Sequence, residues 1–159
     1  MVLAVAPHTH WVDVMVGFAA RNAMKIPHAK FLGKKELFVG PLGWLLRAMG
    51  GVPVDRFSKQ GTVDQFVEMF NSNENFMLGL APEGTRKRVN TLRTGFYHIA
   101  KKAGVPIVPI GFDYENKQVL IGEAFFPGSD EVADLEKIIA FYTGIKGKRT
   151  ELDLRHLKK

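Results

Sequence analysis

A histidine and an aspartate with four residues between them, His8 and Asp13, follow the apolar run MVLAVA. If this run is a strand and Asp13 begins a helix, one tight turn brings the carboxylate to the imidazole Nδ1. That contact leaves Nε2 free to accept a proton, and it stabilises the imidazolium that then forms. The spacing therefore favours a general base, His8, oriented by Asp13.

Two other interpretations of this stretch remain open. His8, His10 and Asp13 are also typical of the first ligands of a metal-dependent hydrolase, although such a site needs more ligands at later strand ends. The remaining histidines follow no predicted strand: His28, His98 and His156. Alternatively, the two histidines lie in an ordinary loop and Asp13 only begins a helix. We expect no metal in the site.

The sequence offers no protein nucleophile for such a base to activate. It contains no cysteine, and none of its serines stands in a G-x-S-x-G turn: Ser58, Ser72 and Ser129. The hydroxyl that His8 deprotonates therefore belongs to a substrate. This predicts direct group transfer without a covalent intermediate and without a cofactor.

A second polar cluster, Glu83-Gly84-Thr85-Arg86, follows the apolar run FMLGLA, and Arg56 follows GGVPVD. An arginine presents a planar fork to phosphate, and Glu83 can accept hydrogen bonds from substrate hydroxyls. Gly84 permits close approach of the backbone to a ligand. The alternative is that the arginines are solvated surface charges and that Glu83 forms a salt bridge with one of them.

The net charge of +6 indicates anionic partners, and no nucleic-acid-binding motif is present. Apolar runs at 1–6, 29–33, 52–54, 76–81 and 106–111 predict strands that alternate with helices near 13–24, 41–49, 62–70, 96–103 and 130–142. Residues 112–122 predict a hairpin. The pattern predicts one α/β domain, residues 1–145, with a mostly parallel or mixed central sheet flanked by helices. Residues 146–159 are expected to form a basic, polar surface tail.

No apolar stretch is long enough to span a bilayer, but residues 37–46 are apolar and aromatic. Four of the residues near this stretch share a helical stripe and are expected in the core: Leu42, Leu45, Leu46 and Met49. Phe38 and Trp44 lie off the stripe, so we expect them to insert at the headgroup level of a membrane. The surface would bind anionic bilayers through these residues and nearby basic side chains.

Four blocks in order carry a resemblance to the glycerolipid acyltransferase family, which includes the 1-acylglycerol-3-phosphate acyltransferases. They are His8–Asp13 with four residues between, Gly50-Gly51-Val52-Pro53-Val54-Asp55-Arg56, Glu83-Gly84-Thr85-Arg86, and Val105-Pro106-Ile107-Val108-Pro109. The resemblance covers about residues 3–127. It implies a glycerol-3-phosphate acyltransferase-like fold and the compact bacterial type of the family.

The resemblance implies transfer of an acyl chain from acyl-CoA or acyl carrier protein to a hydroxyl of a lysophospholipid-type acceptor. His8 would be the base and Asp13 its partner. The acceptor would be bound by Glu83, Thr85, Arg86 and Arg56, and Gly84 would be a backbone donor to the oxyanion. The implied location is cytoplasmic, peripheral on the inner face of the membrane. The open alternatives are a metal-dependent hydrolase and a non-enzymatic anionic-lipid-binding domain.

Overall fold

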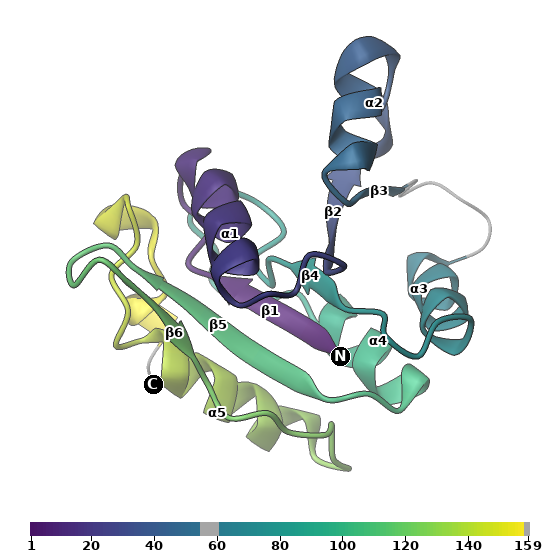
Figure 1. The fold of residues 1–159 in the computed structure, drawn as a ribbon. Coiled ribbons are helices and arrows are strands. Elements are labelled where there is room, and N and C mark those ends of the chain that lie inside the picture. The colour runs from purple at the N-terminus through teal and green to yellow at the C-terminus, as the bar shows by residue number, and fades with distance from the viewer. Residues whose placement is uncertain (55–60, 158–159) are drawn as a thin grey trace.

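The computed structural model describes residues 1–54 and 61–157 and shows a six-stranded sheet (Figure 1). The strands lie in the order β3-β2-β4-β1-β5-β6. β1 to β5 run parallel to one another, and β6 is antiparallel to β5. The predicted mixed α/β sheet and the hairpin are confirmed. The strand bounds are Val2–Ala6 (β1), Lys30–Lys34 (β2), Gly51–Val54 (β3), Leu78–Leu80 (β4), Ile107–Asp113 (β5) and Gln118–Ile121 (β6).

The helices fall where the apolar spacing predicts them. Gly104, with a φ of +64°, ends α4, and the Asp130 side chain begins α5 by accepting a hydrogen bond from the Ala133 N–H. The helices are α1 (Val12–Ala23), α2 (Gly40–Ala48), α3 (Thr62–Asn71), α4 (Gly95–Ala103) and α5 (Glu131–Tyr142), with short 3-10 turns η1 (Lys35–Leu37), η2 (Thr150–Leu152) and η3 (Arg155–Leu157).

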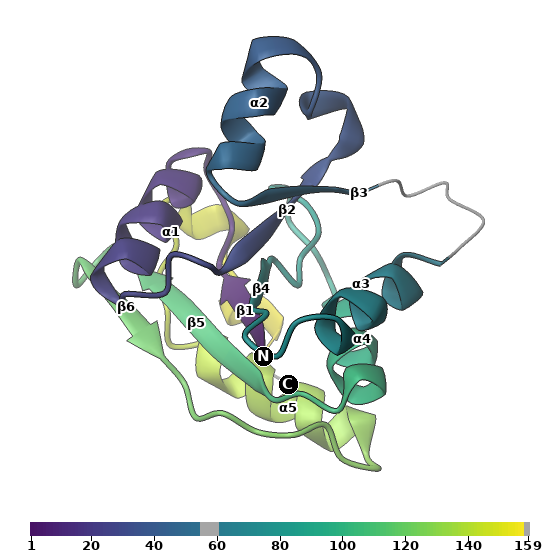
Figure 2. The ribbon, with the colours of Figure 1, turned by 45° about the vertical axis from the view of Figure 1, so that its right-hand side comes forward.

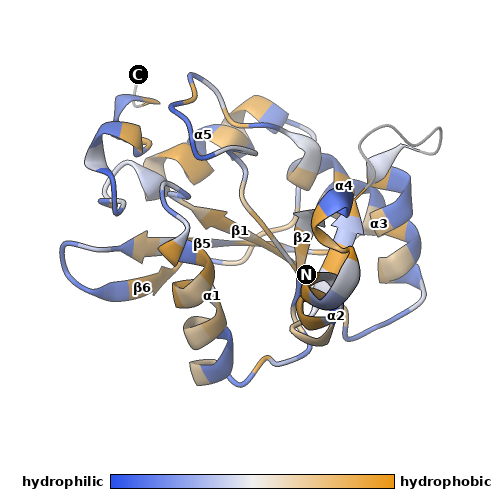
Figure 3. Ribbon diagram, turned by 90° about the horizontal axis from the view of Figure 1, so that it is seen from above, coloured by the Kyte–Doolittle hydropathy of each residue, from blue (hydrophilic) through white to orange (hydrophobic). Residues whose placement is uncertain are grey.

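The sheet has two covered faces because successive residues of a strand point to opposite sides. In β1, Val2, Ala4 and Ala6 pack into a core formed with α3, α4 and α5. Leu3 and its neighbour Val5 belong to a smaller cluster beneath α1 on the other face. Seen from above, the hydrophobic strands β1 and β5 lie between α5 and α1 (Figure 3).

One part of the fold, from β2 through η1 and α2 to β3, extends away from this core (Figure 2). Only two residue pairs join β2 to β4, Lys30 with Leu78 and Phe31 with Gly79. We call residues 30–54 the arm. The arm and α1 line an apolar groove between them.

Phe38 is the internal core of the arm, so the prediction that it inserts into a membrane is wrong. Its side chain is only 4% exposed. A Cβ added at Gly33 or Gly51 would come within 2.6 or 2.8 Å of its ring. The two glycines therefore make room for this ring.

The expected core positions of α2 also differ from the structure. Leu42 and Leu45 are exposed, whereas Leu46 and Met49 are half-buried. Trp44 is 72% exposed, as its position off the stripe predicts. Leu42 and Leu45 are exposed because only one narrow edge of α2 packs toward β3. Among the described residues, nothing covers the rest of the helix surface.

The segment that follows Ile145 packs against the domain instead of lying apart from it. Leu154 is fully buried in the main core, and the Asp153 carboxylate is buried beside the Arg155 guanidinium. The Lys146 carbonyl accepts a hydrogen bond from the Tyr114 N–H, 2.9 Å away. The expected surface tail is thus partly a structural element, with its charged side chains outward.

Candidate active site

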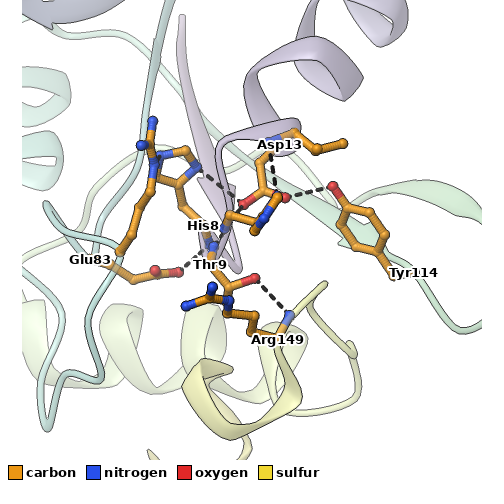
Figure 4. A network of polar contacts seen from close by, with 9 residues as sticks. His8, Thr9, Asp13, Glu83, Tyr114 and Arg149 are labelled. Atoms are coloured by element: carbon orange, nitrogen blue, oxygen red, sulfur yellow. Dashed lines mark hydrogen bonds and ion pairs between the residues drawn. The ribbon is translucent and has the colours of Figure 1, made fainter.

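The site lies where three neighbouring strands, β4, β1 and β5, end at the same edge of the sheet. The residues after these strands include Glu83, His8 and Tyr114, which lie around the buried Asp13 (Figure 4). The carboxyl ends of parallel strands are where α/β proteins gather polar groups. The sheet order therefore brings together side chains that are more than 70 residues apart in the sequence.

His8 and Asp13 form the pair that the spacing predicts. The His8 Nδ1 lies 3.5 Å from the Asp13 Oδ2. The same oxygen accepts hydrogen bonds from the backbone N–H groups of Thr9 and His10, at 2.7 Å each. Asp13 is 1% exposed, so its carboxylate is fixed by the loop that carries His8.

The other Asp13 oxygen contacts a residue that the sequence analysis missed. The Tyr114 hydroxyl donates to Asp13 Oδ1 at 2.6 Å. Tyr114 begins the hairpin turn directly after β5, and β5 is the neighbour of β1. Its position after a predicted strand is the sequence signal for this contact, but the prediction places Tyr114 in a hairpin and gives it no role.

Glu83 has a different place from the one expected for an acceptor-binding residue. It is 1% exposed, and its Oε1 accepts a hydrogen bond from the His8 backbone N–H at 2.8 Å. Burial raises the pKa of Glu83 to about 7, opposed by the His8 hydrogen bond and assisted by the nearby Asp13 charge. Glu83 therefore holds the His8 backbone in place.

This raised pKa predicts a pH dependence of stability. Since the folded-state pKa, about 7, exceeds the ordinary value of 4.5, the folded protein holds the Glu83 proton more tightly than the unfolded chain. The free energy of unfolding should fall as pH rises between these values and level off above them. Glu83→Gln should remove this slope, which denaturant titrations at a series of pH values will measure. Parallel pH profiles of the two proteins would contradict the assignment.

Arg86 contacts the His8 ring nitrogen that does not face Asp13. Its Nε donates to His8 Nε2 at 3.1 Å, and its side chain is otherwise exposed. Burial lowers the pKa of His8, the Asp13 charge opposes this, and the Arg86 charge adds to the lowering. The lowered pKa favours the neutral imidazole, and the Nε2 lone pair of this form accepts the Arg86 N–H.

The remaining predicted binding residues are less directly placed. The Gly84 N–H donates to the Ala81 carbonyl at 3.0 Å, so it is not the free donor that an oxyanion requires. Gly84 has a φ of +65°, and a Cβ there would come within 2.5 Å of the Arg93 side chain. Thr85 accepts a hydrogen bond from the Lys87 N–H within the turn. Arg56 lies outside the described residues.

An apolar groove of about 420 Å³ opens beside the pair, between α1 and the arm. Its floor is the sheet face that carries Leu3, Val5 and Ile110, and its walls include Phe18 and Leu46. Its titratable lining residues are His8, Asp13, Arg21, Lys30 and Arg86. The Arg21 guanidinium is held by the carbonyls of Ala29 and Met49. The groove thus places a long apolar surface next to the His8–Asp13 pair.

The His10 imidazole has a partner of its own at the start of α1. Its Nδ1 accepts a hydrogen bond from the Val12 N–H at 3.3 Å, at the start of α1. Within residues 1–54 and 61–157, no three His, Asp or Glu side chains are grouped so that they could hold a metal ion. The geometry therefore favours separate roles for the two histidines.

The structure has a largely parallel sheet, with a His–Asp pair after its first strand and an E-G-T-R turn after its fourth. This is the arrangement expected of a glycerolipid acyltransferase. The chain belongs to the Acyltransferase family, whose sequence model matches residues 1–113. The 1-acyl-sn-glycerol-3-phosphate acyltransferase of Escherichia coli (strain K12) is 34% identical over 116 residues, covering 67% of this chain and 44% of that protein.

A chloroplastic 1-acyl-sn-glycerol-3-phosphate acyltransferase of Brassica napus is 36% identical over 88 residues, covering 51% of this chain and 25% of that protein. The chain thus spans less than half the length of these two relatives. A crystal structure of the 1-acyl-sn-glycerophosphate (LPA) acyltransferase PlsC from Thermotoga maritima shares the fold, with a TM-score of 0.60 and 19% identity over 89% of this chain and 62% of that chain.

Proposed function

We propose that the protein transfers an acyl chain from a thioester carrier, acyl-CoA or acyl carrier protein, to a hydroxyl of a lysophospholipid-type acceptor. The observation that carries this proposal is the His8–Asp13 pair beside an apolar groove, with the Arg86 guanidinium at His8 Nε2. Transfer of an acyl chain to a phosphate-bearing acceptor requires three features: a base for the hydroxyl, a cation for the phosphate and an apolar channel for the chain. The family and the names of its relatives support the same reaction class.

The proposed reaction needs no protein nucleophile. His8 Nε2 takes the proton of the acceptor hydroxyl as its oxygen attacks the thioester carbonyl carbon. Asp13 stabilises the imidazolium that forms. The tetrahedral oxyanion then collapses, the carbon–sulfur bond breaks, and the leaving thiolate takes the proton from His8. The apolar groove holds the acyl chain, and Arg86 binds the acceptor phosphate. No metal or cofactor takes part beyond the thioester co-substrate.

An acyl-transfer assay tests the proposal directly. Radiolabelled acyl-CoA and acyl carrier protein are each offered with several lysophospholipids, in the presence of a chelator. We expect transfer to at least one phosphate-bearing acceptor and no acylated protein by mass spectrometry after quenching. An adduct on a side chain would contradict direct transfer, whereas activity that needs an added metal would favour a metal-dependent hydrolase.

We also propose that the protein lies peripherally on an anionic membrane, at the inner face, where its acceptor resides. No helix among residues 1–54 and 61–157 has the length and hydropathy needed to cross a bilayer. The exposed apolar side chains of the arm support docking through α2: Val39, Leu42, Trp44 and Leu45. Arg47 on the same helix and the exposed Lys87 and Arg88 add positive charge for anionic headgroups.

The double variant Leu42→Ala/Trp44→Ala should bind anionic vesicles more weakly, because each side chain that enters the bilayer contributes about 1.5–3 kcal/mol. Vesicle co-sedimentation measures this, and added salt should weaken binding by both proteins. Phe126→Ala is the matched control: Phe126 is 67% exposed, in the loop between β6 and α5 at the opposite end from α2 (Figure 1). Equal loss in both variants would argue against docking through α2.

A further inference from the structure

We propose that Tyr114 is a positioning residue of the His8–Asp13 pair: its hydroxyl holds the Asp13 carboxylate so that Oδ2 faces the His8 loop. The hydroxyl lies 2.6 Å from Oδ1, on the side of the carboxylate away from the backbone donors (Figure 4). This inference rests on the proposed function only in its kinetic consequences. The contact itself is a feature of the protein without substrate.

The two carboxylate oxygens have different partners. Oδ2 receives the N–H groups of Thr9 and His10 and faces His8 Nδ1. Oδ1 receives the Tyr114 hydroxyl and, within the described part of the chain, no second hydrogen bond. A buried carboxylate oxygen without a donor is costly, so the carboxylate would rotate or recruit another donor if the hydroxyl were absent. Tyr114 thus fixes the rotation of Asp13 about its side chain.

Tyr114 is itself held from outside by the segment that follows α5. Its backbone N–H donates to the Lys146 carbonyl, and the Lys148 ammonium lies 5.6 Å from the centre of its ring. The same segment reaches the His8 loop, since the Arg149 N–H donates to Thr9 Oγ1 at 3.1 Å. Residues 146–149 lie beyond residues 1–113, which the family model matches. The pair is therefore braced by a part of the chain outside that match.

The charged groups around the pair define what loss of the hydroxyl should do. His8 faces the Asp13 carboxylate at Nδ1, the Arg86 cation at Nε2 and the buried Glu83 at its backbone. From the β5 side, Tyr114 engages part of the Asp13 charge, and Lys148 covers the ring. Without the hydroxyl, more of the carboxylate charge acts on His8, which favours the imidazolium.

The test is Tyr114→Phe, which removes the hydroxyl and keeps the ring. NMR titration of the His8 imidazole needs no substrate, and we expect its pKa to rise by about half a unit or more. In the acyl-transfer assay, kcat should fall about tenfold while the acceptor KM stays within about twofold, and the acidic limb of the pH profile should move to higher pH. An unchanged His8 titration together with an unchanged pH profile would overturn the proposal.

The protein contains a matched control. The Tyr97 hydroxyl donates to the buried Asp134 at 3.0 Å, and neither residue lines the groove beside the His8–Asp13 pair. Tyr97→Phe should lower stability but leave the His8 titration and the kcat of the folded protein unchanged. An equal shift in both variants would mean a general structural effect and would overturn the proposal.

A measurement on the unsubstituted protein covers the case in which Tyr114→Phe does not fold. Burial, followed by the hydrogen bond to Asp13 and its charge, raises the pKa of Tyr114. The NMR signal of the Tyr114 ring carbon that carries the hydroxyl should therefore not report a pKa at the ordinary tyrosine value of about 10. Titration at that value would overturn the proposal. If the unsubstituted protein acylates no lipid, the proposed function fails, while both NMR titrations still decide the role of Tyr114.

Discussion

Replacing His8 by alanine should lower kcat for acyl transfer by about 10²-fold or more, the effect of removing a general base. Asp13→Asn should cost a similar factor, because an amide neither orients Nδ1 as a carboxylate does nor stabilises the imidazolium. Folding of His8→Ala should be preserved, since Glu83 is bound by the His8 backbone N–H and not by the imidazole. Steady-state kinetics on protein shown to be folded by circular dichroism will measure both.

His10→Ala is the matched control for this prediction, because His10 lies two residues away and its imidazole Nδ1 accepts a hydrogen bond from the Val12 N–H at the start of α1. It should lower kcat far less than His8→Ala. If both histidine variants lost activity equally, a single base would be the wrong assignment, and the shared-site interpretation with metal would gain support.

Arg86→Ala should raise the KM for a phosphate-bearing acceptor more than it lowers kcat. A charge-assisted arginine–phosphate contact contributes about 1.5–3 kcal/mol, which sets the expected scale. Arg86→Lys should rescue only part of the loss, because an ammonium cannot form the two-pronged contact. Lys101→Ala, at an exposed cation on α4 outside the site and the proposed membrane surface, is the control and should change KM little.

The comparison of phosphorylated and unphosphorylated acceptors tests what Arg86 recognises. The unsubstituted protein should prefer the phosphorylated acceptor, and Arg86→Ala should lose most of that preference. An unphosphorylated acceptor that both proteins use equally well would show that Arg86 does not bind phosphate.

Much of the fold could be predicted because each strand and helix carries its own apolar period. The strands predicted at 1–6 and 106–111 are found at Val2–Ala6 and Ile107–Asp113. The helix predicted near 130–142 begins at Glu131, one residue after its Asp130 cap. These are local signals, since a strand is indicated by a short run of apolar residues and a helix by apolar residues three or four positions apart.

The arm could not be predicted in this way, because its packing depends on contacts between elements. Phe38 looks exposed on a helical projection, yet Gly33 from β2 and Gly51 from β3 leave the space that its ring fills. Conversely, the apolar stripe of α2 indicates burial, but Leu42 has nothing above it among the described residues. An apolar stripe predicts that a surface will be covered and does not identify what covers it.

The candidate site shows the same limit. His8 and Asp13 are close in sequence, so a turn was enough to predict their contact. The sequence identifies Glu83 as a candidate site residue, but its contact with the His8 backbone depends on β4 lying beside β1. Tyr114 was not found, because only the pairing of β1 with β5 brings its hydroxyl to Asp13.

The hydrogen bond from Arg86 Nε to His8 Nε2 has a consequence for the fate of the thioester. In the absence of an acceptor, water is the competing nucleophile, and a histidine whose lone pair is occupied cannot deprotonate it. Under the proposed function, a phosphate that draws Arg86 aside frees Nε2 just as the correct hydroxyl arrives. This one guanidinium–imidazole contact then determines how many acyl chains are lost to hydrolysis and how many are delivered to lipid.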